Sequence, residues 1–263
     1  MANEIMHGYL KAVAQIEMEK RAKWVWRYMD IGKFISLLNR KSVFFSEASK
    51  FADSREGFAI LPRQEKIINL LERYRESLSG AEIEKVEQKS LNADQVLLKK
   101  LLAISCWNRS EHESVALWNM YTHGNMGVAI RSNFEVLAEQ FKSHRFKLVH
   151  KDVDYESLAI TKKGIEAFFR KANEYKFESE YRFILDFTDD PYWNSNNETA
   201  PSYLVDLVGE GGVYLPIDLN LVIEEIRLHY KAPKWVHEDI VSLVKSFGLD
   251  EKKVKRSDLD DEG

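Results

Sequence analysis

The chain has 263 residues, of which 44% are hydrophobic, 30% charged and 12% aromatic. This balance is typical of a soluble globular protein and excludes a largely disordered chain. The net charge of −4 and the scattered Lys and Arg residues argue against nucleic acid as the default partner, although a local basic face is not excluded. The one cysteine, Cys106, excludes a disulfide framework and provides no zinc-ligand spacing.

The first twenty residues contain three glutamates and no uninterrupted apolar core, so we expect neither a signal peptide nor a transit peptide. No run approaches the roughly 18 apolar residues that a membrane span needs. We therefore expect a cytoplasmic protein with no membrane partner.

The first predicted strand carries an arginine among apolar residues. Residues 8–23 have apolar side chains at helical spacing, and residues 24–29 then alternate as a strand. Arg27 shares one face of that strand with Val25 and Met29. An arginine at such a position is usually either an edge residue in solvent or a paired charge that lines a cleft.

A helix and a second strand follow directly. We expect Asp30 to cap a helix that ends near Asn39, and residues 42–46 to form a strand that contains Ser46. From 62 to 102 the pattern is almost wholly helical, with charged outer faces. We interpret this block as a helical insertion, either solvated or available to a protein partner.

Residues 103–130 hold two Trp, one Tyr and the only Cys, and they predict a buried strand, a short helix, a glycine turn and a second buried strand. Further elements are predicted at 133–141 (helix), 146–153 (strand), 161–173 (helix), 176–187 (strand), 213–216 (strand), 225–230 (strand) and 234–247 (helix). The charged tail 250–263 is expected to be frayed. The sequence therefore predicts one α+β domain over residues 1–263, with a mixed, largely antiparallel sheet, flanking helices and the insertion.

The segment from Cys106 to Ile130 resembles the bacterial family called domain of unknown function 2971. The resemblance rests on a Cys followed by an aromatic residue, a polar turn, a Trp and a Tyr one helical turn apart, and a Gly before a short apolar strand. These are Cys106-Trp107, Trp118, Tyr121 and Gly127-Val128-Ala129-Ile130, and further matches lie at Arg27-Tyr28, Phe44-Phe45-Ser46 and residues 178–182.

A second resemblance is to ADP-ribosyltransferases of the Arg–Ser–Glu type. That resemblance implies that Arg27 holds the phosphates of NAD, that Ser46 orients it, and that Glu180 of Glu178-Ser179-Glu180 is the catalytic carboxylate. The chain departs from the pattern at Phe44, which stands in place of the first Ser of the Ser-x-Ser motif.

Residues 178, 180 and 182 alternate with Phe177, Tyr181 and Phe183, so we expect Glu178, Glu180 and Arg182 on one face of a strand. Two such carboxylates can serve one cleft, with the pKa of one raised and the other kept ionised by Arg182. The alternative is a solvent-facing charged stripe.

The other candidate residues have structural alternatives of their own. Arg27 could pair with one of the two carboxylates, and the aromatic rings of Tyr28 and Trp118 could be core residues instead of stacking on a planar ligand. Cys106 is expected to be an inert thiol, and the histidines show no metal-ligand spacing, so we predict no metal.

Two functions from different classes follow. The first is a cytoplasmic enzyme of bacterial stress or phage defence that acts on NAD or a nucleotide-type molecule, by ADP-ribosyl transfer or NAD glycohydrolysis. Its catalytic residues would be Glu180 and Glu178, and its ligand-binding residues would be Arg27, Tyr28, Ser46, Trp118 and Arg182. The second is a non-catalytic recognition module of such a system, with the partner bound to the insertion.

Overall fold

A computed structural model describes residues 23–51, 98–142, 146–155, 164–187, 208–209 and 211–260. The helices are α2 (Ile31–Arg40), α5 (Val115–Tyr121), α6 (Phe134–Phe141), α8 (Leu219–Val222) and α9 (Lys234–Ser246), with 3-10 helices η1 (Ala48–Lys50), η2 (Gly164–Phe169), η3 (Asn173–Glu178) and η5 (Glu251–Lys253). The strands are β1 (Trp24–Asp30), β2 (Ser42–Glu47), β3 (Leu102–Arg109), β4 (Gly127–Asn133), β5 (Lys147–Asp152), β6 (Glu180–Asp186), β7 (Val208–Gly209), β8 (Gly212–Pro216), β9 (Glu225–Leu228) and β10 (Val254–Lys255).

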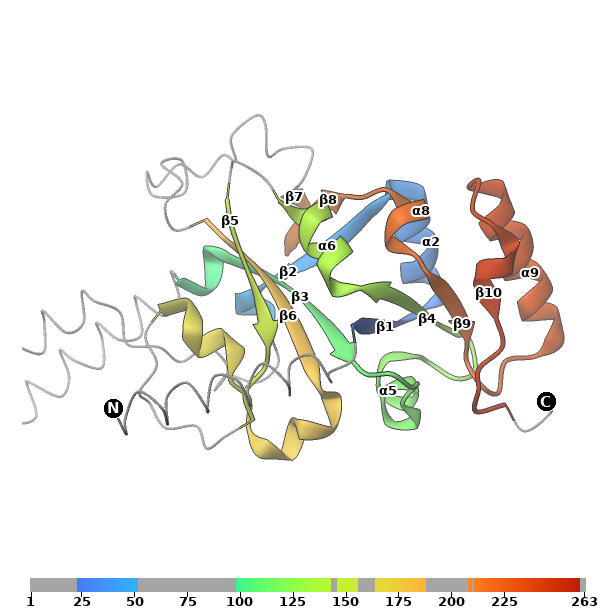
Figure 1. The fold of residues 1–263 in the computed structure, drawn as a ribbon, viewed down its shortest axis with the longest axis horizontal. Helices are drawn as coiled ribbons and strands as arrows, with labels where there is room; N and C mark the ends of the chain where they lie inside the picture. Colours follow the sequence, from blue (N-terminus) through green and yellow to red (C-terminus); the bar gives the residue numbers. More distant parts are fainter. Residues whose placement is uncertain are drawn as a thin grey trace, which may run out of the picture.

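The strands form one mixed sheet in the order β10-β9-β4-β1-β3-β2-β8-β7, with β6 beside β3 and β5 beside β6. Every pair is antiparallel except β10 with β9. The predicted α+β class with a largely antiparallel sheet and flanking helices is thus confirmed (Figure 1).

The sheet divides at β3. On one edge, β3 pairs with β6 along its length, from Leu102 to Asn108. On the other edge, its last residues pair with β1 and its first residues pair with β2, through Ser46 opposite Ile104. Because β1 and β2 share this edge, they separate beside the middle of β3, and the polar residues discussed below lie around this point.

The two faces of the sheet are packed differently. The larger core lies on the face covered by α2, α6, α8 and α9, and it includes Phe34, Phe141 and Phe183. On the opposite face, η1 and η2 pack in one smaller cluster and α5 packs with Trp26 and Tyr28 in another (Figure 1). Apolar residues thus alternate between two buried faces, which explains why several strands have nearly continuous apolar sequences.

Two local predictions need correction. Asp30 precedes α2 as predicted, but its side chain makes no capping bond to the helix and instead accepts a hydrogen bond from the His123 backbone N–H at 2.8 Å. The predicted strand at 176–187 begins only at Glu180, because η3 occupies 173–178 and Ser179 has a φ of +41°. Phe177 is consequently 48% exposed and not part of the core.

The C-terminal tail is ordered as far as the described residues extend. Residues 254 and 255 pair with β9, and the side chain of Val254 joins the larger core. Glu113 accepts hydrogen bonds from the Ser257 hydroxyl and the Asp258 backbone N–H, both at 2.8 Å. The charge of this segment predicted a frayed tail, and the prediction is wrong for residues 254–258. Val254 packs into the core, and Glu113 binds Ser257 and Asp258.

The predicted insertion at 62–102 lies mostly outside the described residues. Its last part is described, with residues 98–100 helical and β3 beginning at Leu102. In the described ranges, no helix is long and apolar enough to cross a membrane.

Candidate functional site

Two glutamates and two cations form a buried cluster at the start of β6. Lys171 binds the carboxylates of both Glu178 and Glu180, the latter at 3.5 Å. Arg182 donates from Nε to Glu180 at 2.7 Å and from a terminal nitrogen to the Phe168 carbonyl oxygen at 2.7 Å. Because Ser179 has a left-handed backbone conformation, Glu178 ends η3 and does not belong to β6. Lys171 nevertheless binds both carboxylates.

Burial separates this cluster from an ordinary surface ion-pair network. Glu178, Glu180 and Arg182 are 3%, 6% and 1% exposed, so the alternative of a solvent-facing stripe is wrong. Removing charged groups from water is costly unless each is paired and hydrogen-bonded. The chain therefore maintains two carboxylates and two cations in an unfavourable environment, which is common at functional sites.

The two carboxylates differ in proton affinity. Burial raises the pKa of Glu178 to about 6, partly offset by the hydrogen bond from Lys171. Burial alone would also raise the pKa of Glu180, but the charges of Arg182 and Lys171 outweigh it and lower that pKa. Near neutral pH the cluster thus contains one firmly ionised carboxylate beside one that exchanges a proton readily, which is the arrangement of an acid–base pair.

Tyrosines border the cluster on the side of α5 and after β5. Tyr155 accepts a hydrogen bond from the Glu180 backbone N–H at 2.7 Å. Tyr121, at the end of α5, is 41% exposed, and its pKa is raised by desolvation and by the negative charges of Glu178 and Glu180. Cys106, directly opposite Arg182 in the sheet, is half-buried. The exposed surface at Tyr121 is therefore close to the cluster.

Arg27 lies where β1 and β2 separate, and its partners are neutral. Its guanidinium donates to the Ser105 hydroxyl and to the Phe44 carbonyl oxygen, both at 3.0 Å, and lies 5.6 Å from the centre of the Trp107 ring. Within the described part of the chain it forms no ion pair, so the predicted alternative of a carboxylate partner is wrong there. Desolvation lowers the pKa of Arg27 to about 10, and the group remains a cation at neutral pH.

The register places Arg27 and Glu180 on opposite faces of the sheet. Glu180 is opposite Asn108, and Asn108 is opposite Trp26, so these three side chains share a face. Arg27, the next residue in β1, points to the other face. The hydrogen bonds of Arg27 to Ser105 of β3 and Phe44 of β2 hold its guanidinium on that face, where β1 and β2 separate.

Ser46 shares the face of Glu180, because it is paired with Ile104 and therefore lies on the side of Cys106. Within the described ranges, its hydroxyl makes a single 3.4 Å contact, with the Glu47 carbonyl oxygen. The serine that binds Arg27 is Ser105, which was not among the residues predicted from the sequence. Only the strand order could have revealed it, since β3 and not β2 lies between β1 and β6 in the sheet.

Tyr28 and Trp118 are buried, 7% and 0% exposed, with their rings edge to face at 5.0 Å. The Tyr28 hydroxyl accepts from the Ser114 backbone N–H at 2.8 Å, and the Trp118 ring nitrogen donates to Glu113 at 3.1 Å. These contacts make them core residues between β1 and α5. The predicted contact of either ring with a ligand stays a prediction, and so does that of Arg182.

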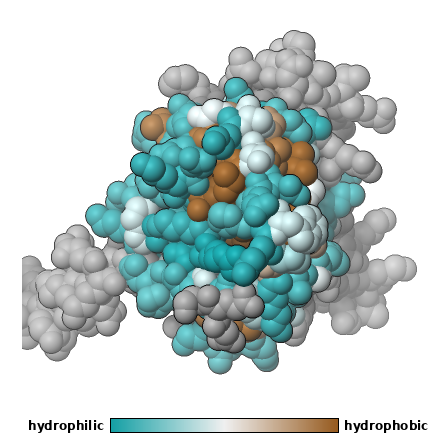
Figure 2. All heavy atoms as spheres, turned by 90° about the vertical axis from the view of Figure 1, so that its right-hand side faces the viewer, coloured by the Kyte–Doolittle hydropathy of each residue, from teal (hydrophilic) through white to brown (hydrophobic). Residues whose placement is uncertain are grey.

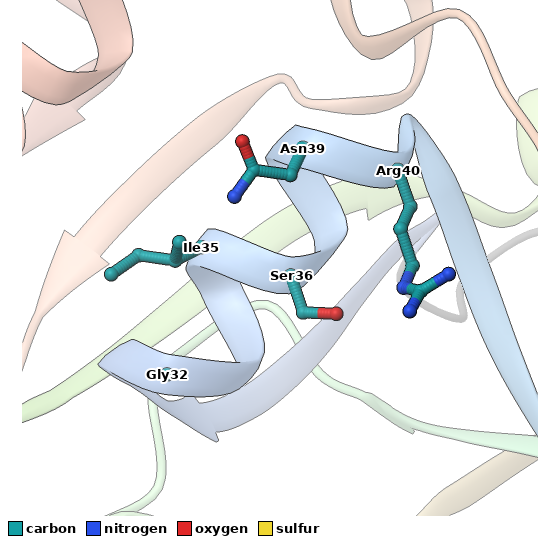
Figure 3. Close-up of a pocket in the computed structure, with 5 residues that line it drawn as sticks. All are labelled: Gly32, Ile35, Ser36, Asn39 and Arg40. Carbon is teal, nitrogen blue, oxygen red and sulfur yellow. The ribbon is translucent and has the colours of Figure 1, made fainter. Parts of the chain in front are cut away.

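A separate hollow lies on the outward face of α2. It has a volume of about 390 Å³ and is lined by Gly32, Ile35, Ser36, Asn39 and Arg40 (Figure 3). These residues are spaced by three or four and form one stripe of the helix. None of the predicted site residues is among them, and the buried cluster is a better candidate because it contains the perturbed ionisable groups.

Within the described ranges, no three His, Cys, Asp or Glu side chains are grouped as a metal site would require. A scan against models of protein families finds no match to the chain, and a search of curated proteins finds no significant match.

Proposed function

We propose that this protein is an enzyme that cleaves the N-glycosidic bond of NAD or a related nucleotide, by ADP-ribosyl transfer or NAD glycohydrolysis. The observation that carries the proposal is the buried pair Glu178 and Glu180, which share Lys171 and have pKa values displaced in opposite directions. Cleavage of a glycosidic bond through an oxocarbenium-like transition state commonly uses two carboxylates with different protonation.

Each residue of the pair has a distinct part in the proposed reaction. The ionised Glu180 stabilises the positive charge that develops on the ribose as the bond to nicotinamide breaks, and nicotinamide leaves as a neutral molecule. Glu178, with a pKa of about 6, accepts the proton of the water or acceptor hydroxyl that forms the new bond. The products are nicotinamide, a proton, and either ADP-ribose or an ADP-ribosylated acceptor.

Arg27 supports a nucleotide as the ligand class. Its guanidinium is held by two neutral oxygens, has no carboxylate partner among the described residues, and lies on the sheet face opposite Glu180. A cation of this kind is suited to a phosphate group. Arg27→Met should therefore weaken binding of NAD and of ADP-ribose but leave binding of nicotinamide unchanged, as measured by titration calorimetry.

The test of the enzyme is nicotinamide release from NAD by wild type, Glu180→Gln and Glu225→Gln. Glu225 is a matched control because it is 1% exposed and binds Arg227 two residues later, as Glu180 binds Arg182. Both substitutions should cost similar stability, because each leaves a buried arginine facing a neutral amide. Glu180→Gln should abolish release while folded Glu225→Gln retains it, and equal activity in wild type and Glu180→Gln would contradict the proposal.

The alternative is a non-catalytic recognition module. The face that carries α9 is largely hydrophilic but has a hydrophobic area in its upper half, which is a common feature of protein-binding surfaces (Figure 2). Under this alternative, charge reversal along residues 65–75 of the insertion should abolish binding of a captured partner while Glu180→Gln should not. We place either activity in the bacterial cytoplasm, in stress or phage defence.

A further inference from the structure

Asn108 has a side-chain oxygen that is buried and lacks a partner. The residue is 7% exposed and lies in β3, directly opposite Glu180. Its amide nitrogen donates to the Glu178 carbonyl oxygen at 2.7 Å, whereas its oxygen, Oδ1, has no hydrogen-bond partner among the residues that the structure describes. Buried polar atoms are hydrogen-bonded in the large majority of cases, so an unpaired acceptor next to two perturbed carboxylates requires an explanation.

The orientation of this amide is determined by its one hydrogen bond. A carbonyl oxygen can only accept, so the Glu178 carbonyl must face the nitrogen of the Asn108 amide. Exchanging the two ends of the amide would bring two acceptors together. The unpaired Oδ1 therefore points away from the Glu178 backbone, on the sheet face shared with Glu180 and Cys106.

The two cations of the cluster already bind other acceptors. Lys171 binds both carboxylates, and Arg182 binds Glu180 and the Phe168 carbonyl oxygen. Glu178 and Glu180 are themselves acceptors when ionised. The cluster therefore presents an excess of acceptor oxygens, and a ligand that carries N–H or O–H donors complements it.

We infer that Asn108 is the residue that recognises the substrate at this site, by accepting a hydrogen bond through Oδ1 from a donor next to the bond that Glu180 acts on. This inference rests on the proposed function. In NAD two groups meet the requirement, namely the carboxamide N–H of nicotinamide and the 2′-hydroxyl of the adjoining ribose. Both sources have the same chemistry, a hydrogen-bond donor beside the glycosidic carbon.

Titration calorimetry with three probes distinguishes the sources. The probes are NAD, its 3-acetylpyridine counterpart, which lacks the amide N–H and adds no charge, and an analogue with fluorine in place of the 2′-hydroxyl on the nicotinamide ribose. Wild type should bind one of the two analogues about 10-fold more weakly than NAD, the cost of leaving one buried acceptor unpaired. Asn108→Ala should bind NAD about 10-fold more weakly than wild type and should not discriminate against that analogue.

Ser132→Ala is the matched control, because the Ser132 hydroxyl is also buried with no partner in the described part of the chain, in β4 and on the opposite face of the sheet. It should bind all three probes as wild type does. Thermal melting monitors folding, and the analogue comparison in wild type needs no substitution at all.

Two kinds of result would overturn the inference. One kind leaves the proposed function standing, and the other removes it as well. If wild type binds NAD but neither analogue is discriminated, or if Asn108→Ala binds NAD equally well, Asn108 has no recognition role and the proposed function stands. A crystal structure of the NAD complex with only a water on Oδ1 would lead to the same conclusion. If wild type binds no NAD, the proposed function fails together with the inference.

Discussion

The guanidinium of Arg27 donates a 3.0 Å hydrogen bond to the hydroxyl of Ser105, at the point where β1 leaves β3. The same hydroxyl accepts the ring N–H of Trp107, also at 3.0 Å. Ser105 is 1% exposed, so a single buried oxygen satisfies two donors from two residues. It thereby fixes the position of the one cation that the proposed function assigns to phosphate.

Ser105→Ala should lower the free energy of unfolding by about 1–3 kcal/mol, because it leaves two buried donors without their acceptor. Urea denaturation measures this change. Ser46→Ala is the control, since the Ser46 hydroxyl makes only the 3.4 Å contact with the Glu47 carbonyl oxygen, and it should shift stability by no more than about 0.5 kcal/mol. If the two variants lost equal free energy of unfolding, the hydrogen bonds of Ser105 would make no contribution to stability beyond that of an ordinary serine.

The raised pKa of Glu178 predicts a pH dependence of stability. Between its usual pKa and about 6, the folded protein binds more protons at this group than the unfolded chain does, so its contribution to stability decreases as pH rises. Relative to wild type, Glu178→Gln should therefore gain about 1.5 kcal/mol in unfolding free energy between roughly pH 4.5 and pH 6.5. The contribution of histidine titration is the same in both proteins, so it cancels in this difference. A difference that does not change over this range would contradict the raised pKa.

Glu113 connects the C-terminal segment to α5. Its carboxylate is 2% exposed and accepts from the Trp118 ring nitrogen, the Ser257 hydroxyl and the Asp258 backbone N–H. Glu113→Ala should lower the free energy of unfolding by about 1–3 kcal/mol, because three donors lose their acceptor while Arg227 keeps Glu225 and Asp258 as partners. Hydrogen exchange should become faster at residues 254–260 and in α5. Glu111→Ala, at an exposed position, should leave both the stability and the exchange unchanged.

The sequence predicted the elements well where one strong periodic signal was present. The strands at 24–29 and 42–46 and the helices at 133–141 and 234–247 all have described counterparts with bounds within a residue or two. These segments are organised by local alternation or by helical spacing of apolar residues. The start of β6 was misplaced because the left-handed backbone of Ser179, which ends η3, leaves no mark in an alternating pattern.

The candidate site was only partly predictable, because its main features depend on residues distant in sequence. The sequence identified Glu178, Glu180 and Arg182 as a group, and the structure holds them together. It could not reveal Lys171 or Asn108, whose contacts depend on η3 and on the pairing of β3 with β6. Nor could it show that Ser105 is the partner of Arg27, since that requires the strand order of the sheet.

The central claim is that Glu178 and Glu180 share one cation yet have pKa values displaced in opposite directions. Titration of the side-chain carboxyl carbons by ¹³C NMR tests it most directly, with Glu178→Gln and Glu180→Gln used to assign the two signals. We predict a pKa of about 6 for Glu178 and a pKa below the ordinary glutamate value for Glu180. Two carboxylates that titrate together at the ordinary value would contradict the account.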